Sequence, residues 1–463
     1  MKKTKINLFL IIILCLVFAF TGCSKKEDEL NTSEPIKTED TSLSIVTDSG
    51  STAKESTGSS TTDSGSSAEP AYDYGDSTLE FPYAEEYKTA SETADDMIWE
   101  GTSDAIGTTE ADIPKEPAPQ VSAGTLTAGE WSDNKNFDFL KKLLSDGQDY
   151  NYKEFFTNWE LNPFNRLVIS CVSNGTPVTG AKVTILDAQG NPIWKGVTDY
   201  EGKAYGYYAL LDPDMMPSTV KAEFNGDVQE YAVTNDDLLD TSVIEMNFNE
   251  YVPNAKSLDL MFVIDTTGSM GDEIYYLQSE LENVIKRVQN DTSNIPTRLS
   301  VNFYRDQGDD YVVRPYEFST DINTQLAYLN REYANGGGDY EEAVEEALED
   351  AISNHKWDDD SIKILFLVLD APPHNTDSIR ESLKDSIAKA SELGIRIIPV
   401  ASSGIDKGTE FLLRTFAMTT GGTYTFLTDH SGVGGSHIEP TIGQYEVEYL
   451  NDLMVRLIEQ YIG

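Results

Sequence analysis

Three oxygen-bearing side chains follow a run of apolar residues in LDLMFVIDTTGSM, residues 258–270. Asp265 ends the run, and Thr267 and Ser269 follow it at alternate positions. Carboxylate and hydroxyl oxygens are hard ligands, which suit Mg²⁺, Ca²⁺ or Mn²⁺ better than they suit zinc or copper. The spacing therefore indicates a loop that binds a hard divalent cation.

The element that must position this loop is the apolar run itself. Residues 258–264 are nearly all apolar or β-favouring, which is the pattern of a strand buried on both faces in a parallel sheet. Open α/β sheets bind their ligands beyond the carboxyl ends of such strands. We therefore expect all three oxygen-bearing side chains on one tight loop at that edge of a sheet.

Residues 257–463 alternate strand-like and helix-like segments, which predicts an α/β domain with a doubly wound, mostly parallel sheet. The link RDQGDD between the second and third strands is too short for a parallel crossover, so we expect one antiparallel edge strand. The predicted strands are 258–264, 298–304, 311–318, 362–369, 395–401 and 423–427, and the predicted helices lie near 271–290, 321–332, 340–354, 377–393, 409–418 and 445–460.

The segment before this domain has a different pattern. Residues 166–250 form short alternating runs separated by turn signals, which predicts a small all-β sandwich. The string PVTGAKVTILDAQGNPIWKGVTDYEGKAYGYYAL resembles the carboxypeptidase-regulatory-like sandwiches of bacterial surface proteins. That resemblance implies a spacer or binding scaffold without catalytic residues. Residues 131–165, with FDFLKKLL and YKEFFTNW, predict a helical connector.

Residues 1–22 predict a secretory signal, because lysines precede an apolar stretch that is too short for a typical spanning helix. The residues before Cys23 resemble a bacterial lipobox. This resemblance implies cleavage before Cys23 and a lipid on its sulfur, which would anchor the protein to the cell membrane on its extracytoplasmic side. An ordinary signal peptide with an incidental cysteine is the alternative.

Residues 23–130 are rich in Ser, Thr, Gly, Asp and Glu and poor in large aliphatic side chains. Such a segment buries too little apolar surface to offset its ordering entropy, so we predict a disordered acidic stalk. The whole chain of 463 residues has a formal charge of −45, which argues against nucleic-acid binding and against adhesion to anionic headgroups. We expect no nucleic-acid partner, and contact with the membrane through the lipid anchor.

Three loops of the carboxyl-terminal segment resemble the von Willebrand factor type A domain. Their sequences are DTTGSM at 265–270, GGGDYEEAV at 336–344 and LVLDAPPH at 367–374. The resemblance spans nearly all of 257–463 and implies a metal-ion-dependent adhesion site, at which Mg²⁺, or else Ca²⁺ or Mn²⁺, helps to bind a partner. Carried over to this chain, it implies five metal ligands: Asp265, Thr267, Ser269, Asp339 and Asp370.

Asp339 departs from the family's pattern, which usually has Thr at this place. Three carboxylates around one divalent cation leave a formal charge of −1, which attracts a partner's carboxylate less. We expect Arg305 or His374 to reach the rim of the site and either neutralise Asp339 or donate to the bound partner. The hypothesis is a constitutively held cation and a partner that need not present a carboxylate.

Each of these ligands also has a purely structural explanation. Asp265, Thr267, Ser269 and Asp339 are residue types that cap helices, and Asp370 before two prolines can shape a turn. These explanations stay open from the sequence alone.

Binding is the function that the sequence favours over catalysis. The chain has no P-loop lysine motif and no GxSxG elbow, and Thr267 stands where a haloacid-dehalogenase-type phosphotransferase needs a second carboxylate. We predict a surface-exposed lipoprotein that binds an unknown protein or other cell-surface macromolecule and is not an enzyme. The alternatives are a structural surface protein whose metal stiffens the loop, and a Mg²⁺-dependent hydrolase.

Overall fold

The computed structural model describes residues 126–145, 152–239, 242–251, 257–292, 295–431 and 436–463. The predicted signal peptide, Cys23 and the predicted stalk up to residue 125 lie outside these described residues. Within the described ranges, no helix combines the length and apolar character needed to cross a bilayer.

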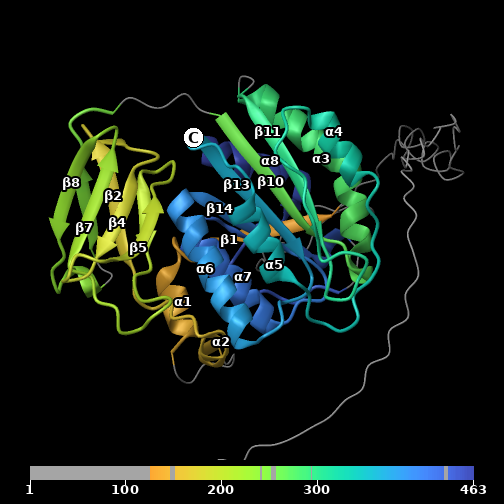
Figure 1. Cartoon of the computed structure of the whole chain (residues 1–463), viewed down its shortest axis with the longest axis horizontal. Helices are drawn as coiled ribbons and strands as arrows, with labels where there is room; N and C mark the ends of the chain where they lie inside the picture. The colour runs from red at the N-terminus through yellow and green to blue at the C-terminus, as the bar shows by residue number, and fades with distance from the viewer. Residues whose placement is uncertain (1–125, 146–151, 240–241, 252–256, 293–294, 432–435) are drawn as a thin grey trace, which may run out of the picture. The chain divides into compact units, whose positions relative to one another are not determined.

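The largest sheet has eight strands in the order β12-β11-β10-β13-β14-β15-β1-β16 (Figure 1). Its central strands β11, β10, β13, β14 and β15 are parallel. At one edge β12 pairs antiparallel with β11, as the short link RDQGDD predicts, and at the other edge β1 pairs antiparallel with β15 and β16. The strands are β1 (Thr127–Trp131), β10 (Ser257–Asp265), β11 (Thr297–Tyr304), β12 (Val313–Arg314), β13 (Ser361–Leu369), β14 (Ile395–Ala401), β15 (Tyr424–Thr428) and β16 (Glu448–Tyr449).

Helices cover both faces of this sheet because successive side chains of its central strands point to opposite sides. Met261 and Val263 of β10 belong to a core that includes α5, α6 and α7, whereas Leu260 and Phe262 belong to one that includes α3, α4 and α8. The apolar run is therefore buried on both faces, as predicted. The helices are α3 (Gly271–Asp291), α4 (Ile322–Leu329), α5 (Val344–Glu349), α6 (Asp377–Leu393), α7 (Lys407–Thr420) and α8 (Leu450–Ile462).

The chain order changes direction at β10, which has β11 on one side and β13 on the other. In an open α/β sheet, such a reversal leaves a crevice beyond the carboxyl ends of the two diverging strands. The loops after β10 and β13 begin there. The first contains a short 3₁₀ turn, Gly268–Met270, before α3 begins.

β1 is not among the strands predicted from the sequence, and the assignment of residues 127–130 to the stalk is wrong. Thr127–Trp131 pairs along its whole length with β15, and Ala128 is fully buried. The short sequence TAGEW carries no strand periodicity, because its place in the sheet depends on β15, almost 300 residues away in the sequence. The α/β domain therefore also includes chain that precedes its predicted start at residue 257.

Two predicted elements are shorter than expected. The helix predicted over 340–354 begins at Val344 and ends in a π-helical segment, Asp350–Asn354. The residues before it extend toward the loop after β13, where the Glu342 N–H donates to the Pro372 carbonyl at 2.9 Å. The strand predicted over 311–318 is only the pair Val313–Arg314.

Residues 167–247 form two four-stranded sheets with one shared core, here called the β module. In β2, alternate residues such as Leu167, Ile169 and Cys171 point into that core. Between β1 and the β module lie α1 (Phe137–Leu143) and α2 (Tyr152–Trp159). The strands are β2 (Leu167–Ser173), β3 (Thr176–Pro177), β4 (Lys182–Leu186), β5 (Pro192–Val197), β6 (Lys203–Gly206), β7 (Thr219–Phe224), β8 (Asp227–Ala232) and β9 (Val243–Asn247), with a 3₁₀ turn at Asp237–Leu239.

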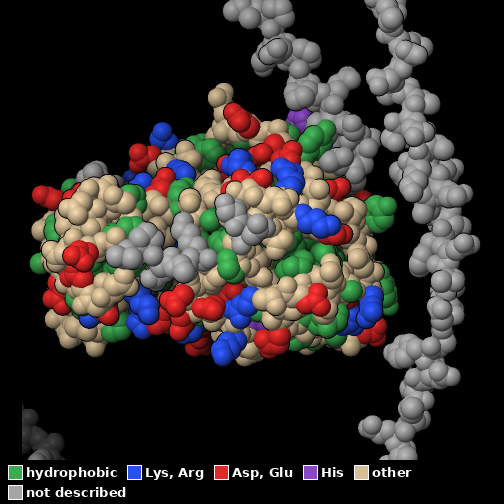
Figure 2. Space-filling view, turned by 90° about the horizontal axis from the view of Figure 1, so that it is seen from above, with side chains coloured by type: hydrophobic (Ala, Val, Ile, Leu, Met, Phe, Trp, Pro, Cys, Tyr) green, Lys and Arg blue, Asp and Glu red, His purple; other side chains and the backbone are tan. Residues whose placement is uncertain are grey.

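The surface of the described part carries both signs of charge. Figure 2 shows one face on which lysine and arginine side chains lie among the acidic ones. The acidic side chains of the described part therefore do not form one continuous patch on this face.

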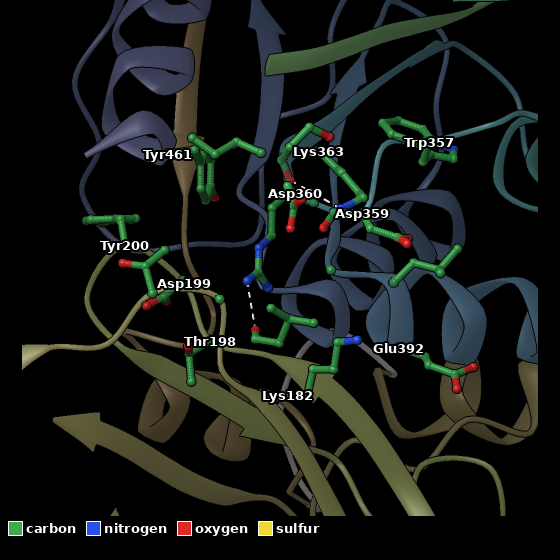
Figure 3. A pocket seen from close by; sticks show the side chains of 18 of the residues that line it. Lys182, Thr198, Asp199, Tyr200, Trp357, Asp359, Asp360, Lys363, Glu392 and Tyr461 are labelled. Atoms are coloured by element: carbon green, nitrogen blue, oxygen red, sulfur yellow. Dashed lines mark hydrogen bonds between the residues drawn. The ribbon is translucent and has the colours of Figure 1, made fainter. Parts of the chain in front are cut away.

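A cavity of about 210 Å³ lies between the β module and the amino-terminal ends of β13 and β14 (Figure 3). The β module contributes Lys182 and Asp199, and the α/β domain contributes Lys363 and Tyr461. Burial raises the pKa of Asp199 and lowers the pKa of Lys363. Because β13 and β14 begin at this cavity, it lies at the amino-terminal ends of the parallel strands. The crevice after β10 lies at their carboxyl ends.

Candidate metal centre

Asp265 is fully buried at the carboxyl end of β10. Its Oδ1 accepts hydrogen bonds from the backbone N–H of Thr267 at 2.9 Å and from the Thr267 hydroxyl at 2.8 Å. Its Oδ2 has no hydrogen-bond partner among the described residues. A buried, ionised carboxylate oxygen is costly when nothing compensates it, so this atom needs a proton or a cation.

Asp370 occupies the matching place after β13. It is buried, and its Oδ1 has no partner in the part of the chain that the structure describes. Burial raises the pKa of Asp370, although a hydrogen bond with Ser269 opposes that effect. Burial and the charge of Asp370 together raise the pKa of Asp265 to about 7. The structure thus brings Asp265, Thr267, Ser269 and Asp370 together from two separate loops.

Helix capping does not explain the first loop. The N-cap position of α3 is Met270, and no side-chain cap bond is found there or at Thr267 within the described ranges. The bonds from Thr267 instead fix the orientation of Asp265. Helix capping therefore does not account for these side chains.

Two further carboxylates belong to this centre and were not predicted as ligands. Burial raises the pKa of Glu342 to about 9, with added repulsion from Asp265, Asp306 and Asp370. Burial likewise raises the pKa of Glu273, in the first turn of α3, to about 7, with added repulsion from Asp370. Each has one buried oxygen, Oε2, that finds no partner within the described stretches.

We call Asp265, Glu273, Glu342 and Asp370 the acidic centre. The sequence offered one signal for Glu342, which is the string GGGDYEEAV that contains it. The spacing of that string does not show which of its acids points inward. Glu273 had no signal, because an acidic residue in a first helical turn is ordinary.

Asp339 belongs to a second group of possible metal ligands. It is exposed, and it groups with Asp306 and His374, whose ligand atoms lie within 4.8 Å of one another and of its own. It does not cap α5, whose N-cap position is Ala343. Glu342, three residues further on, is the residue of this loop that faces Asp265 and Asp370.

Arg305 and His374, the two residues expected at the rim, lie in different surroundings. Arg305 is 2% exposed, and its Nη2 donates to the Tyr333 carbonyl at 3.0 Å and lies 3.5 Å from Glu332 Oε1. Its charge therefore compensates buried Glu332, which leaves His374 as the candidate, of the two expected, that lies near Asp339. His374 is half-buried, and its Nε2 lies 3.2 Å from Asp306 Oδ1, in the same group as Asp339.

The donor set of the acidic centre fits a hard divalent cation. Asp265, Glu342 and Asp370 offer carboxylate oxygens without partners among the residues described, and Thr267 and Ser269 offer hydroxyls. Mg²⁺ and Ca²⁺ prefer such all-oxygen surroundings. A cation would supply the positive charge that carboxylates with raised pKa values lack.

Comparisons with known proteins agree with this geometry. Residues 259–434 match the family model of the von Willebrand factor A domain. A stretch of 137 residues is 28% identical to part of an ariadne-like RING finger protein of Acanthamoeba polyphaga mimivirus, and it covers 29% of this chain and 13% of that protein. The match thus spans about an eighth of the relative's length. The part that matches the von Willebrand factor A model contains β10, β13 and the loops that carry the acidic centre.

Proposed function

We propose that this protein is an extracytoplasmic lipoprotein that binds another macromolecule through a divalent cation held by its von Willebrand factor A domain. The supporting observation is the pair of buried carboxylate oxygens, Asp265 Oδ2 and Asp370 Oδ1, which lack partners among the described residues at one crevice of the sheet. Von Willebrand factor A domains often bind proteins and divalent metal ions, which agrees with a binding role.

The proposed ligands are Asp265, Thr267, Ser269, Glu342 and Asp370, with Glu342 in the place first given to Asp339. A divalent cation bound there supplies an open coordination position that a partner's oxygen can occupy. Three ionised carboxylates with one such cation leave a formal charge of −1. The site therefore favours a neutral oxygen from the partner, such as an amide carbonyl or a hydroxyl, over a carboxylate.

Cation binding is tested by isothermal titration calorimetry of the full-length chain with Mg²⁺, Ca²⁺ and Mn²⁺. Asp370→Asn should weaken binding by about tenfold or more, because it removes a ligand charge. Asp385→Asn is the matched control, since Asp385 is an exposed residue of α6. Equal affinities for wild type and Asp370→Asn would contradict the proposal.

Partner binding is tested by cross-linking at the surface of intact cells in the presence of Mg²⁺ or EDTA. We expect one set of cross-linked partners that depends on Mg²⁺ and is lost in Asp370→Asn. If Mg²⁺ raises the melting temperature without any cation-dependent partner, the cation has a structural role. If the chain hydrolyses a phosphoester with Mg²⁺ and Asp370→Asn abolishes the turnover, the protein is an enzyme.

The location is a separate part of the proposal and rests on the sequence before Cys23. Metabolic labelling with a palmitate analogue should label the wild-type chain, and Cys23→Ser should abolish the label and release the protein from the membrane fraction. Unlabelled wild-type protein would point to an ordinary secretory signal. We propose the β module as the carboxypeptidase-regulatory-like scaffold that accompanies the binding domain.

A further inference from the structure

We propose that Asp306, Asp339 and His374 form a second metal site, separate from the acidic centre, which takes a transition-metal ion such as Mn²⁺ or Zn²⁺. One ligand atom of each residue lies within 4.8 Å of the ligand atoms of the other two. Metal–ligand bonds of about 2.0–2.2 Å place two ligands of one ion roughly 3–4.4 Å apart. Only a small contraction is therefore needed, and Asp306 Oδ1 and His374 Nε2 are already 3.2 Å apart.

The three ligands come from three loops that are tied together without a metal. Asp309 Oδ2 accepts from the Asp306 N–H at 3.2 Å and from the Gly337 N–H at 2.9 Å, which joins the loop after β11 to the glycine-rich loop of Asp339. The Glu342–Pro372 backbone bond joins the glycine-rich loop to the loop of His374. The positions of the ligands are therefore set by the fold rather than by chance contact of long side chains.

An independent observation is the buried carboxylate of Glu345 beside this group. Glu345 is 6% exposed, and its Oε2 lacks a partner among the residues that the structure describes. Its carboxylate interacts electrostatically with both His374 and Asp306, and burial raises its pKa to about 7. A buried acceptor without a partner, next to two carboxylates and an imidazole, is explained by a cation that neutralises all of them.

The donor types distinguish the two sites. The acidic centre offers oxygen atoms alone, which suit Mg²⁺ or Ca²⁺, whereas the second site adds an imidazole nitrogen, which suits Mn²⁺ or Zn²⁺. In the metal-free chain, His374 Nε2 and Asp306 Oδ1 share a hydrogen bond at 3.2 Å. A metal ion bound to Nε2 would take the place of that hydrogen bond, and the neutral imidazole would then carry its hydrogen on Nδ1.

The test is pulsed electron paramagnetic resonance of Mn²⁺ bound to the full-length chain. Wild type should show Mn²⁺ coupled to an imidazole ¹⁴N, and His374→Gln should abolish the coupling. The matched control is His437→Gln, because His437 Nδ1 also pairs with an aspartate, Asp429, at 2.8 Å, without belonging to a group of three ligands among the described residues. That control variant should keep the coupling.

A second pair of variants separates this inference from the proposed function. Asp339→Asn should weaken the affinity for the nitrogen-coupled Mn²⁺ by about tenfold or more and leave the affinity for Mg²⁺ unchanged. Asp370→Asn should weaken the affinity for Mg²⁺ and leave the affinity for the nitrogen-coupled Mn²⁺ unchanged. If Asp370→Asn binds Mg²⁺ as wild type does while the nitrogen coupling persists, the proposed function fails and the second site stands. Wild-type Mn²⁺ without ¹⁴N coupling, or coupling that survives in folded His374→Gln protein, would overturn the second site. Circular dichroism of each variant verifies that it is folded.

Discussion

The carboxylates of the acidic centre make the metal-free protein sensitive to pH. Burial raises the pKa of Asp265 and of Glu273 to about 7 and that of Glu342 to about 9, so each group holds its proton more tightly when folded than when unfolded. The stability that protonation provides is present at low pH and is lost as pH rises from about 4 to about 9. In EDTA the melting temperature should therefore fall across this range.

Saturating Mg²⁺ should reduce this loss, because a bound cation stabilises the ionised carboxylates. Differential scanning calorimetry at several pH values, with EDTA or with Mg²⁺, makes the comparison. A metal-free melting temperature that stays constant or rises over this range would show that the acidic centre does not accumulate protons in the folded state.

Glu342 offers a sharper test of which acid of the glycine-rich loop serves the cation. Glu342→Gln removes a carboxyl group whose pKa burial and nearby acids raise to about 9, so it should raise the melting temperature of the metal-free chain above about pH 9, where wild-type Glu342 carries a charge that Asp265 and Asp370 repel. It should also weaken Mg²⁺ binding by about tenfold, because a ligand is lost. Glu341→Gln, a change in the neighbouring residue, should alter neither quantity. Wild-type Mg²⁺ affinity in Glu342→Gln would remove Glu342 from the ligand set.

Some individual residues of the site could be predicted from their spacing alone. Asp265, Thr267 and Ser269 follow an apolar strand directly, so their common loop was evident. The surroundings of Asp339 could not be predicted in the same way, because its loop does not continue a regular element. Gly336 and Gly337 have φ values of +82° and +73°, a left-handed backbone that helix or strand periodicity does not indicate, and Glu342 of the same loop is repelled by Asp265.

Among the elements, the segment that follows β1 is joined to α7 by a buried ion pair. Arg414 Nη2 lies 2.6 Å from Asp133 Oδ1, and its Nε donates to Asp133 Oδ2 at 2.9 Å. Both side chains are almost inaccessible to solvent. Removing one partner leaves a buried charge without its compensation, so Asp133→Asn should lower the free energy of unfolding by about 3 kcal/mol.

Denaturant unfolding measures this loss, with Asp138→Asn as the control. Asp138 pairs with Lys141 at 2.8 Å on the surface, so its removal should have no measurable effect. Equal stabilities for the Asp133→Asn and Asp138→Asn variants would mean that Glu410, 3.6 Å from Arg414, compensates the guanidinium alone.

Most strands and helices of the α/β domain followed from periodicity, because each carries its own apolar pattern. β1 did not, since its side chains gain their burial only from partners that lie far along the chain. Ala128 is opposite Leu427, and Gly129 leaves room for the rings of Phe426 and Tyr445, which a β-carbon would meet at 2.6 and 2.8 Å. Such long-range complementarity has no local signature.

At the scale of the whole molecule, β1 changes the relation between the β module and the α/β domain. The chain forms β1 in the large sheet, continues through α1 and α2 into the β module, and returns to the large sheet at β10. The β module is thus inserted between two strands of one sheet. The β module therefore has two chain connections to the large sheet.

Arg396 contributes to the contact between the two parts. Its Nη1 donates to the Thr420 carbonyl at 2.8 Å within the α/β domain, and its Nη2 donates to the Val197 carbonyl of β5, also at 2.8 Å. Because of this contact and the double connection, we expect the wild-type chain to unfold in one cooperative transition. Arg396→Ala leaves two carbonyls without their donor and should split the transition into two.

The surface pair between Lys195 and Glu392 at 2.8 Å crosses the same boundary, so Lys195→Ala is the matched control. Exposed ion pairs contribute only about 0–1 kcal/mol, and this variant should keep a single transition. Calorimetric scans of wild type and both variants provide the comparison. If Arg396→Ala also unfolds in one transition, the double connection through β1 and β10 couples the parts without Arg396. If the wild type itself unfolds in two transitions, the β module is an independent domain despite its insertion.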